Sequence, residues 1–259
     1  MYEAIMIAAT GLKNQQRRMD VIANNVANVN SAAFKSDRLD FKDALYTTGI
    51  VPNYPRTPAP DGNQQKGHGV MVAGITKDYS TGAFQRTDRH LDVAIEGEGF
   101  YELEDPNGGI VYTRNGSLEL GEGGDGMYLV SGDGWFIHDA DGQRIKVPDD
   151  MGSVAIDTDG TIRFEANGEE TTVKLGLFTF RNLTGLMSSG NGNLSETVAS
   201  GEKMPATGAV VRQGELEISN VKLSEEMTRI IRTQRVFQLS SRALTTADEM
   251  DAIANNMRR

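Results

Sequence analysis

The stretch Met19-Asp20-Val21-Ile22-Ala23-Asn24-Asn25-Val26 returns near the other end of the chain as Met250-Asp251-Ala252-Ile253-Ala254-Asn255-Asn256-Met257, with six of eight positions identical. Each copy lies in a segment whose apolar residues have the spacing of an amphipathic helix. The sequence between the two copies has the shorter period of β-strands. Matching helices at the two ends predict termini that pair and still present helical surface to further copies of the chain. This plan is typical of a building block rather than of an enzyme.

The first helical segment has the a/d pattern of a coiled coil, because two lines of residues recur every seven positions and are offset by three. The polar member of this seam is Gln15. The helix is expected to weaken over the Asn-rich residues 24–31, since Asn favours caps and turns. The two lines are Ile5, Leu12, Met19 and Val26, and Ala8, Gln15, Ile22 and Val29.

The second helical segment is expected to begin near Ser219-Asn220, with Glu225 and Glu226 at the positive end of the helix dipole. Its apolar line then drifts around the helix, as a 3.6-residue period does against a strict heptad. The line begins with Leu223, Ile230, Phe237 and Leu244 and drifts to Val236, Ala243, Met250 and Met257.

The middle of the chain has two patterns. Residues 47–69 are rich in Pro and Gly and predict an extended, mobile arm. From Val70 onward, short apolar runs alternate with Gly, Asp and Asn turns, which indicates antiparallel β structure. We therefore predict an α+β fold whose terminal helices pair as a coiled-coil-like segment around a central all-antiparallel β domain. The expected parts are an N-terminal helix (1–33), a connecting segment with the arm (34–69), the β domain (70–212) and a C-terminal helix (213–259).

Composition excludes several classes of function. The chain has 259 residues, a net charge of -10 and no cysteine. The negative charge argues against nucleic-acid binding and against docking on an anionic membrane. Without cysteine there are no disulfides, thiol nucleophiles or zinc–thiolate sites. No stretch has the roughly 20 apolar residues of a membrane span, and the first ten residues do not resemble a cleavable secretory signal.

Three features could carry chemistry, and each has a simpler explanation. The Asp-x-Asp-Gly stretches ending at Gly142 and Gly160 lack the outer ligands of a calcium loop and predict hairpin turns. The histidines have no catalytic or metal-binding spacing. Neighbouring carboxylates are expected by chance among 36 acidic residues. We predict no cofactor, metal or catalytic site. The candidates considered are His68, His90, His138, Glu96 with Glu98, and Glu102 with Glu104.

Three segments in this order together resemble the rod and hook family of bacterial flagellar axial proteins. The resemblance covers almost the whole chain, and the order of the segments makes it specific. The first is residues 22–35, ending in Phe34-Lys35; the second comprises 82–84, 91–100 and 112–117; the third is 213–221, followed by Glu226-Met227, Ile231 and Gln234-Arg235.

The resemblance implies a structural subunit that stacks helically into a hollow, torque-transmitting shaft in the basal body, with the terminal helices inside and the β domain outside. It also implies export through the flagellar type III apparatus without a cleaved signal. The expected partners are copies of the chain, neighbouring rod and hook proteins and the bushing rings. The length resembles rod proteins, and the arm at 47–69 resembles the distal-rod subunit, with the proximal-rod subunit as the alternative.

We predict the assembly contacts on the two helical segments, which alone should be marginal and become ordered on stacking. The rival from another class is a secreted carbohydrate-active enzyme with converging carboxylates in residues 90–180, and a third candidate is a trimeric phage receptor-binding or tail protein. The predicted contact residues are Ile5, Leu12, Gln15, Met19, Ile22, Asn25, Val26, Leu223, Ile230, Gln234, Phe237, Leu244 and Met250.

Overall fold

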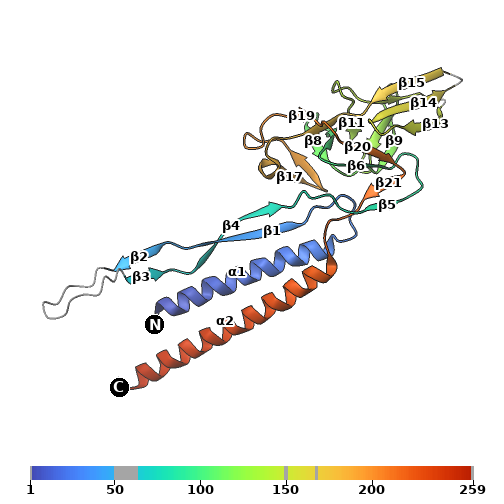
Figure 1. Ribbon diagram of the computed structural model, residues 1–259. Coiled ribbons are helices and arrows are strands. Elements are labelled where there is room, and N and C mark those ends of the chain that lie inside the picture. Colours follow the sequence, from blue (N-terminus) through green and yellow to red (C-terminus); the bar gives the residue numbers. More distant parts are fainter. Residues whose placement is uncertain (1, 50–63, 149–150, 167–168, 258–259) are drawn as a thin grey trace. The chain divides into compact units, whose positions relative to one another are not determined.

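The computed structural model describes residues 2–49, 64–148, 151–166 and 169–257 (Figure 1). It has one long helix at each end and antiparallel strands between them, which confirms the predicted α+β fold. The chain forms two compact units. The helix unit takes residues from 1–27, 37–76 and 222–259, and the β unit takes residues 28–36 and 77–221.

These boundaries differ from those expected at residues 69 and 212. The strand that begins at Val70 pairs with residues 37–43 and so belongs to the helix unit. Residues 215–217 pair with residues 84–86 and belong to the β unit. The second helix accordingly begins at Leu223 rather than near Ser219. Backbone pairing, which the local pattern does not reveal, sets both boundaries.

In the helix unit, α1 (Tyr2–Ala27) contacts both α2 (Leu223–Met257) and β1 (Asp37–Asp43). It lies between α2 and the pair formed by β1 and β4 (Val70–Lys77) (Figure 1). The contact between the helices confirms that the terminal segments pair. β2 (Tyr46–Gly49) and β3 (Gln64–Gly67) form an antiparallel hairpin at the two ends of the predicted arm, whose residues 50–63 lie outside the described residues.

The β unit consists of a ten-stranded sheet, a three-stranded sheet and two separate strand pairs. The long sheet runs in the order β12-β10-β11-β7-β8-β18-β17, with β9, β16 and β19 joined beside it. β13-β14-β15 form the second sheet, and β20-β6 and β21-β5 form the pairs. The bounds are β5 Phe84–Arg86, β6 Val93–Glu96, β7 Phe100–Glu104, β8 Ile110–Thr113, β9 Leu118–Gly123, β10 Gly126–Ser131, β11 Phe136–Ile137, β12 Lys146–Val147, β13 Met151–Ile156, β14 Thr161–Ala166, β15 Glu169–Lys174, β16 Leu177–Thr179, the 3₁₀ turn η1 Leu183–Gly185, β17 Met187–Gly190, β18 Asn193–Ser195, β19 Met204–Pro205, β20 Val210–Gln213 and β21 Glu215–Glu217.

Two apolar clusters fill the β unit. The larger one joins side chains of the long sheet to side chains of β13–β15, including Tyr101, Leu129 and Phe164. The smaller one packs Phe100, Tyr112 and Phe180 edge to face or at a tilt, among other apolar side chains. A domain with its own core of this kind does not need the terminal helices to bury its apolar surface.

The suspected calcium loops are turns, as predicted. In the turn between β13 and β14, the N–H of Asp157 donates to the carbonyl of Thr161 at 2.9 Å, and Gly160 has a φ of 85°. In the other turn the Asp139 carboxylate accepts the N–H groups of Asp141 and Gln143. The carboxylates of Asp139 and Asp159 are therefore committed to local hydrogen bonds, the latter with the N–H and the hydroxyl of Thr161.

Candidate functional site: the paired helices and a buried ion cluster

The α1 side of the helix pair follows the predicted seam. Ile22 is 4% exposed and the other members of both lines up to Val26 are half-buried. Gln15 is the polar interruption, and its Oε1 is buried without a hydrogen-bond partner among the described residues. The seam members with this burial are Ile5, Ala8, Leu12, Gln15, Met19, Ile22 and Val26.

The α2 side follows a different line from the predicted one. Glu226 and Thr233 are buried, at 3% exposure each, and three small side chains continue their seven-residue spacing. Only the second line, offset by four, contains the predicted residues Ile230, Phe237 and Leu244. Small and polar residues pack here, so a search for apolar repeats does not find them. The full seam is Glu226, Thr233, Ser240, Ala247 and Ala254 with Ile230, Phe237, Leu244 and Asp251.

Four of the residues predicted as assembly contacts lie outside the seam between the two helices of one chain, which leaves their role between copies a prediction. Leu223, Gln234 and Met250 are exposed on α2, away from α1. Asn25 is buried at 1% exposure but bonds to β1. Its Nδ2 donates to the carbonyl of Asp37 and its Oδ1 accepts the N–H of Asp37, both at 2.9 Å. The amide thus satisfies both backbone groups at the start of β1, as a neighbouring strand would.

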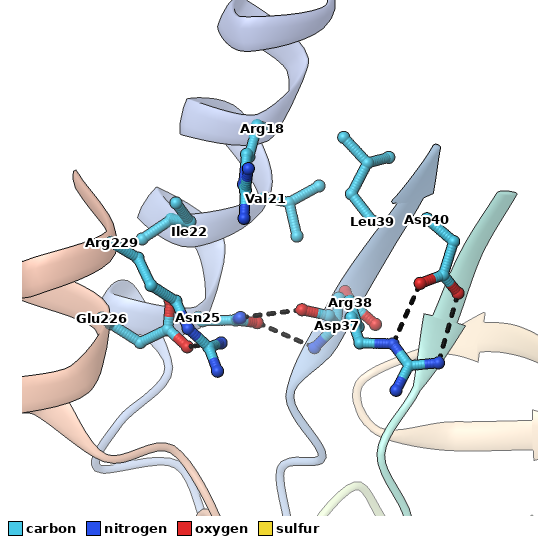
Figure 2. A pocket seen from close by; sticks show the side chains of 10 residues that line it. All are labelled: Arg18, Val21, Ile22, Asn25, Asp37, Arg38, Leu39, Asp40, Glu226 and Arg229. Carbon is cyan, nitrogen blue, oxygen red and sulfur yellow. Dashed lines mark hydrogen bonds and ion pairs between the residues drawn. The ribbon is translucent and has the colours of Figure 1, made fainter. Parts of the chain in front are cut away.

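A cavity of about 300 Å³ opens beside this contact, between α1, α2 and β1 (Figure 2). Its lining carries three arginines and three carboxylates. Glu226 Oε1 accepts a hydrogen bond from Arg229 at 2.7 Å, whereas its buried Oε2 has no partner among the described residues. The charges balance, so the cavity favours neither an anion nor a cation. The charged residues in the lining are Arg18, Arg38, Arg229, Asp37, Asp40 and Glu226.

A cluster of three buried ions lies in the β unit. Lys35, Arg114 and Glu217 are each at most 6% exposed. Lys35 Nζ donates to Glu217 Oε1 at 2.7 Å, and Arg114 Nε donates to Glu217 Oε2 at 2.5 Å. The N–H of Gly82 adds a third donor to Oε1 at 2.6 Å. Buried charges are tolerated only when they are paired and hydrogen-bonded in this way.

The remaining donors of the two cations bind backbone carbonyls. Arg114 donates to the carbonyls of Ile95, Gly97 and Gly99, and Lys35 donates to that of Ser80 at 2.7 Å. Every segment used in the family resemblance therefore contributes to one cluster. Sequence reasoning recognised these segments without detecting that their charged residues meet.

The electrostatics of the cluster follow from its burial. Burial lowers the pKa of Lys35, and the hydrogen bond to Glu217 opposes this effect. Burial alone would raise the pKa of Glu217, but Arg114 and Lys35 hold it below the ordinary value of 4.5. Glu217 is thus ionised at neutral pH and matches the charge of its partners.

Of the carboxylates considered for catalysis, Glu96, Glu102 and Glu104 are held in ion pairs. His138 lies between Glu102 and Glu104, with N···O distances of 3.0 and 3.2 Å. Lys203 donates to Glu102 at 2.5 Å, and Arg144 donates twice to Glu104, at 2.7 and 2.8 Å. The described residues contain no cluster of three or more His, Asp or Glu side chains that could hold a metal ion. The cluster around His138 is therefore a structural ion network.

Comparison with known proteins gives the family. A profile described as "Flagella basal body rod protein" matches residues 5–35, "Flagellar hook protein FlgE/F/G D1 domain" matches 94–164, and "Flagellar basal body rod FlgEFG protein C-terminal" matches 212–257. The flagellar basal-body rod protein FlgG of Borreliella burgdorferi is 35% identical over 100% of both chains. The chain belongs to the flagellar basal-body rod protein family.

Two further full-length relatives carry the same name. FlgG of Bacillus subtilis is 36% identical over 100% of both chains. FlgG of Buchnera aphidicola subsp. Acyrthosiphon pisum is 35% identical over 96% of this chain and 97% of its own. These relatives confirm the rod-protein interpretation with its distal-rod assignment and do not favour the alternatives. This rod protein is accordingly a structural component of the flagellum. None of its described helices is long and apolar enough to cross a membrane.

Proposed function

We propose that this rod protein assembles with copies of itself, through its paired terminal helices, into the hollow shaft that transmits torque from the motor to the hook. The observation that carries the proposal is the apolar surface left uncovered on α2. Eight of its large apolar side chains retain 40–78% exposure, far from what a helix packed only for its own domain would show. They are Leu223, Met227, Ile231, Val236, Leu239, Met250, Ile253 and Met257.

The fold supports an open assembly. The β unit has its own core, so the helix pair is free to serve contacts between copies. When one surface of a copy binds a different surface of the next copy, the assembly closes only if the rotation between copies forms a ring. Otherwise it grows into a helical filament. We place the helices at the inner wall and the β unit outside. The helices gain further order from stacking, because a pair with this much uncovered apolar surface is marginal alone.

The shaft has partners at its ends and on its outer surface within the same proposal. We propose that the shaft ends contact neighbouring rod and hook proteins, that the outer surface faces the bushing rings, and that the chain reaches this place through the flagellar type III apparatus. We propose no enzymatic activity, because the candidate carboxylates Glu96, Glu102 and Glu104 are held in ion pairs.

Light scattering and electron microscopy of the purified chain, from dilute to concentrated solution, test self-assembly. We expect helical tubes above a threshold concentration, and their loss when residues 1–30 are removed. A monomer or a closed trimer at every concentration, with or without added rod and hook proteins, would contradict the proposal.

A further inference from the structure

The uncovered apolar residues in the second half of α2 form a regular line. Val236 is 43% exposed, Leu239 64%, Met250 55% and Ile253 58%. Their spacing alternates between three and four residues once Ala243, Thr246 and Met257 are included, and none of the seven belongs to the α1-facing seam. This set, the outward seam, is a second a/d pattern on the same helix.

A helix with two a/d seams has surface for two helical partners. Among the described residues α2 has one such partner, since α1 covers only one of its sides (Figure 1). The second partner therefore comes from another molecule. Because the outward seam lies beside the seam already in use, a partner helix there would extend the existing helix pair sideways.

The outward face of α1 has the matching spacing. Seven of its exposed positions also alternate between three and four residues, and they carry mainly small or polar side chains. Small residues leave holes into which larger apolar side chains can insert. The positions are Met6, Ala9, Lys13, Gln16, Asp20, Ala23 and Ala27.

The exposed charges fix one alignment of these two faces. On α1, Lys13 and Asp20 are seven residues apart; on α2, Arg242 and Glu249 are also seven apart. When the helices run in opposite directions, the register that places Lys13 beside Glu249 also places Asp20 beside Arg242. None of these four side chains forms an ion pair within the part of the chain that the structure describes.

The same register matches the apolar positions. It places Ala9 beside Ile253 and Ala23 beside Leu239, so a large side chain meets a small one at these two levels. A shift of one heptad in the direction that brings Lys13 to Arg242 would oppose two like charges, which is unfavourable.

We propose that the outward seam of α2 binds the outward face of α1 of a second copy, antiparallel, with Lys13 of that copy beside Glu249 and Asp20 beside Arg242. This inference rests on the proposed self-assembly and names its contact. The contact joins two different surfaces, so each copy can bind one neighbour on each side and the assembly stays open.

The chain cannot make this contact with itself. Its own residues 18–25 of α1 and 226–229 of α2 line one cavity and therefore lie at about the same level (Figure 2). Counting back along the antiparallel pair from the middle of these stretches puts its own Lys13 level with about residue 236, which is roughly two heptads from Glu249. At 1.5 Å per residue the two copies are displaced by about 21 Å along the helices.

Cross-linking tests the register, because the chain contains no cysteine of its own. The double variant Lys13→Cys/Glu249→Cys is assembled and treated with a short bismaleimide. We expect a ladder of covalent multimers, since residues 13 and 249 of one chain are too far apart to react with each other. The matched control Lys13→Cys/Arg242→Cys is one heptad out of register, about 10 Å, and should give no ladder.

The outcomes separate this contact from self-assembly in general. Tubes in the microscope without a 13–249 ladder, an equal ladder from the control, or covalent dimers only would overturn the proposed contact and leave self-assembly standing. A chain that forms no tubes at all would overturn both.

Charge reversal gives a second measurement. We expect Glu249→Lys to raise the concentration needed for assembly by roughly tenfold, because it places a second positive charge beside Lys13 of the neighbouring copy. The additional change Lys13→Glu should restore assembly, and Asp248→Lys, which alters charge equally on another face of α2, should have little effect. An equal effect of Asp248→Lys, or no rescue by Lys13→Glu, would overturn the register.

Discussion

Glu217 accepts donors from three parts of the chain that lie far apart in sequence. Lys35 is 182 residues away and donates to its Oε1, and Arg114 is 103 residues away and donates to its Oε2. Removing one member would leave the charge of another buried and unpaired, which costs far more than the loss of an exposed ion pair. The segments shared with the family are therefore held together by these buried ion pairs as well as by apolar packing.

Arg114→Ala should destabilise the β unit by about 3–5 kcal/mol, because Glu217 and several carbonyl groups lose their donor inside the protein. Denaturant unfolding followed by Trp135 fluorescence measures this. Arg212→Ala is the control, since it removes an arginine from an exposed pair with Glu96 and should have little effect. Equal effects of the two substitutions would contradict the role assigned to the cluster.

Gly116→Ala should destabilise the β unit by about 3 kcal/mol, since a Cβ there would lie 1.6 Å from the carbonyl oxygen of Val93 and force the backbone apart. Gly124→Ala has open space around its Cβ and should change stability by less than about 0.5 kcal/mol. The same unfolding measurement compares them. A stable Gly116→Ala variant would show that this close approach is not required.

Glu104 gives the β unit an acid-sensitive contribution to stability. The hydrogen bonds from Arg144 lower its pKa to about 2, from an ordinary value of 4.5. Because the folded-state pKa is depressed, the contribution is present above about pH 4.5 and is lost as the pH falls towards 2. Glu104→Gln should thus be less stable than the wild type at pH 6, and the difference should shrink by pH 2. A constant difference across this range would contradict the ion pair.

The contacts of individual side chains were the least predictable feature from sequence. The turns at Gly142 and Gly160 could be predicted, because Asp and Gly specify them locally. The ion cluster could not, because no local pattern indicates that Lys35, Arg114 and Glu217 meet. The bonds of His138 to Glu102 and Glu104 could not be predicted either, because they depend on the pairing of β7 with β11.

Among the elements, the two helices differ in how well their sequences specify the packed face. In α1 most of the large apolar residues lie in the seam, although Met6 and Ile7 are exposed, so periodicity found it. In α2 the seam runs through Glu226, Thr233 and three small residues, while large apolar residues such as Met250 lie outside. A hydrophobic pattern reports the most apolar line of a helix, and here that line includes surface left for other molecules.

Phe237→Asp should separate the helix pair, because it places a charge in the half-buried seam opposite α1. We expect loss of tube formation with an unchanged unfolding transition of the β unit, and the same from Leu12→Asp. Gln238→Asp introduces the same charge at the next, exposed position and should assemble normally. Tubes from both seam variants would contradict the assigned role of the pair.

For the molecule as a whole, the α+β class and the paired termini could be predicted from the repeated helical segments. The division into units could not, because β1, β4 and α1 associate through contacts such as the one from Asn25 to Asp37. The segment from residue 213 to residue 221 joins the β unit for a similar reason, its pairing with β5. Both depend on partners distant in sequence.

Helical reconstruction of the assembled polymer by electron cryomicroscopy locates the paired helices within the assembly. We expect a tube whose inner wall consists of α1 and α2 from successive copies, with the β unit outside. A closed ring, or a tube whose wall is built from β density with the helices free outside it, would show that the paired helices do not build the shaft.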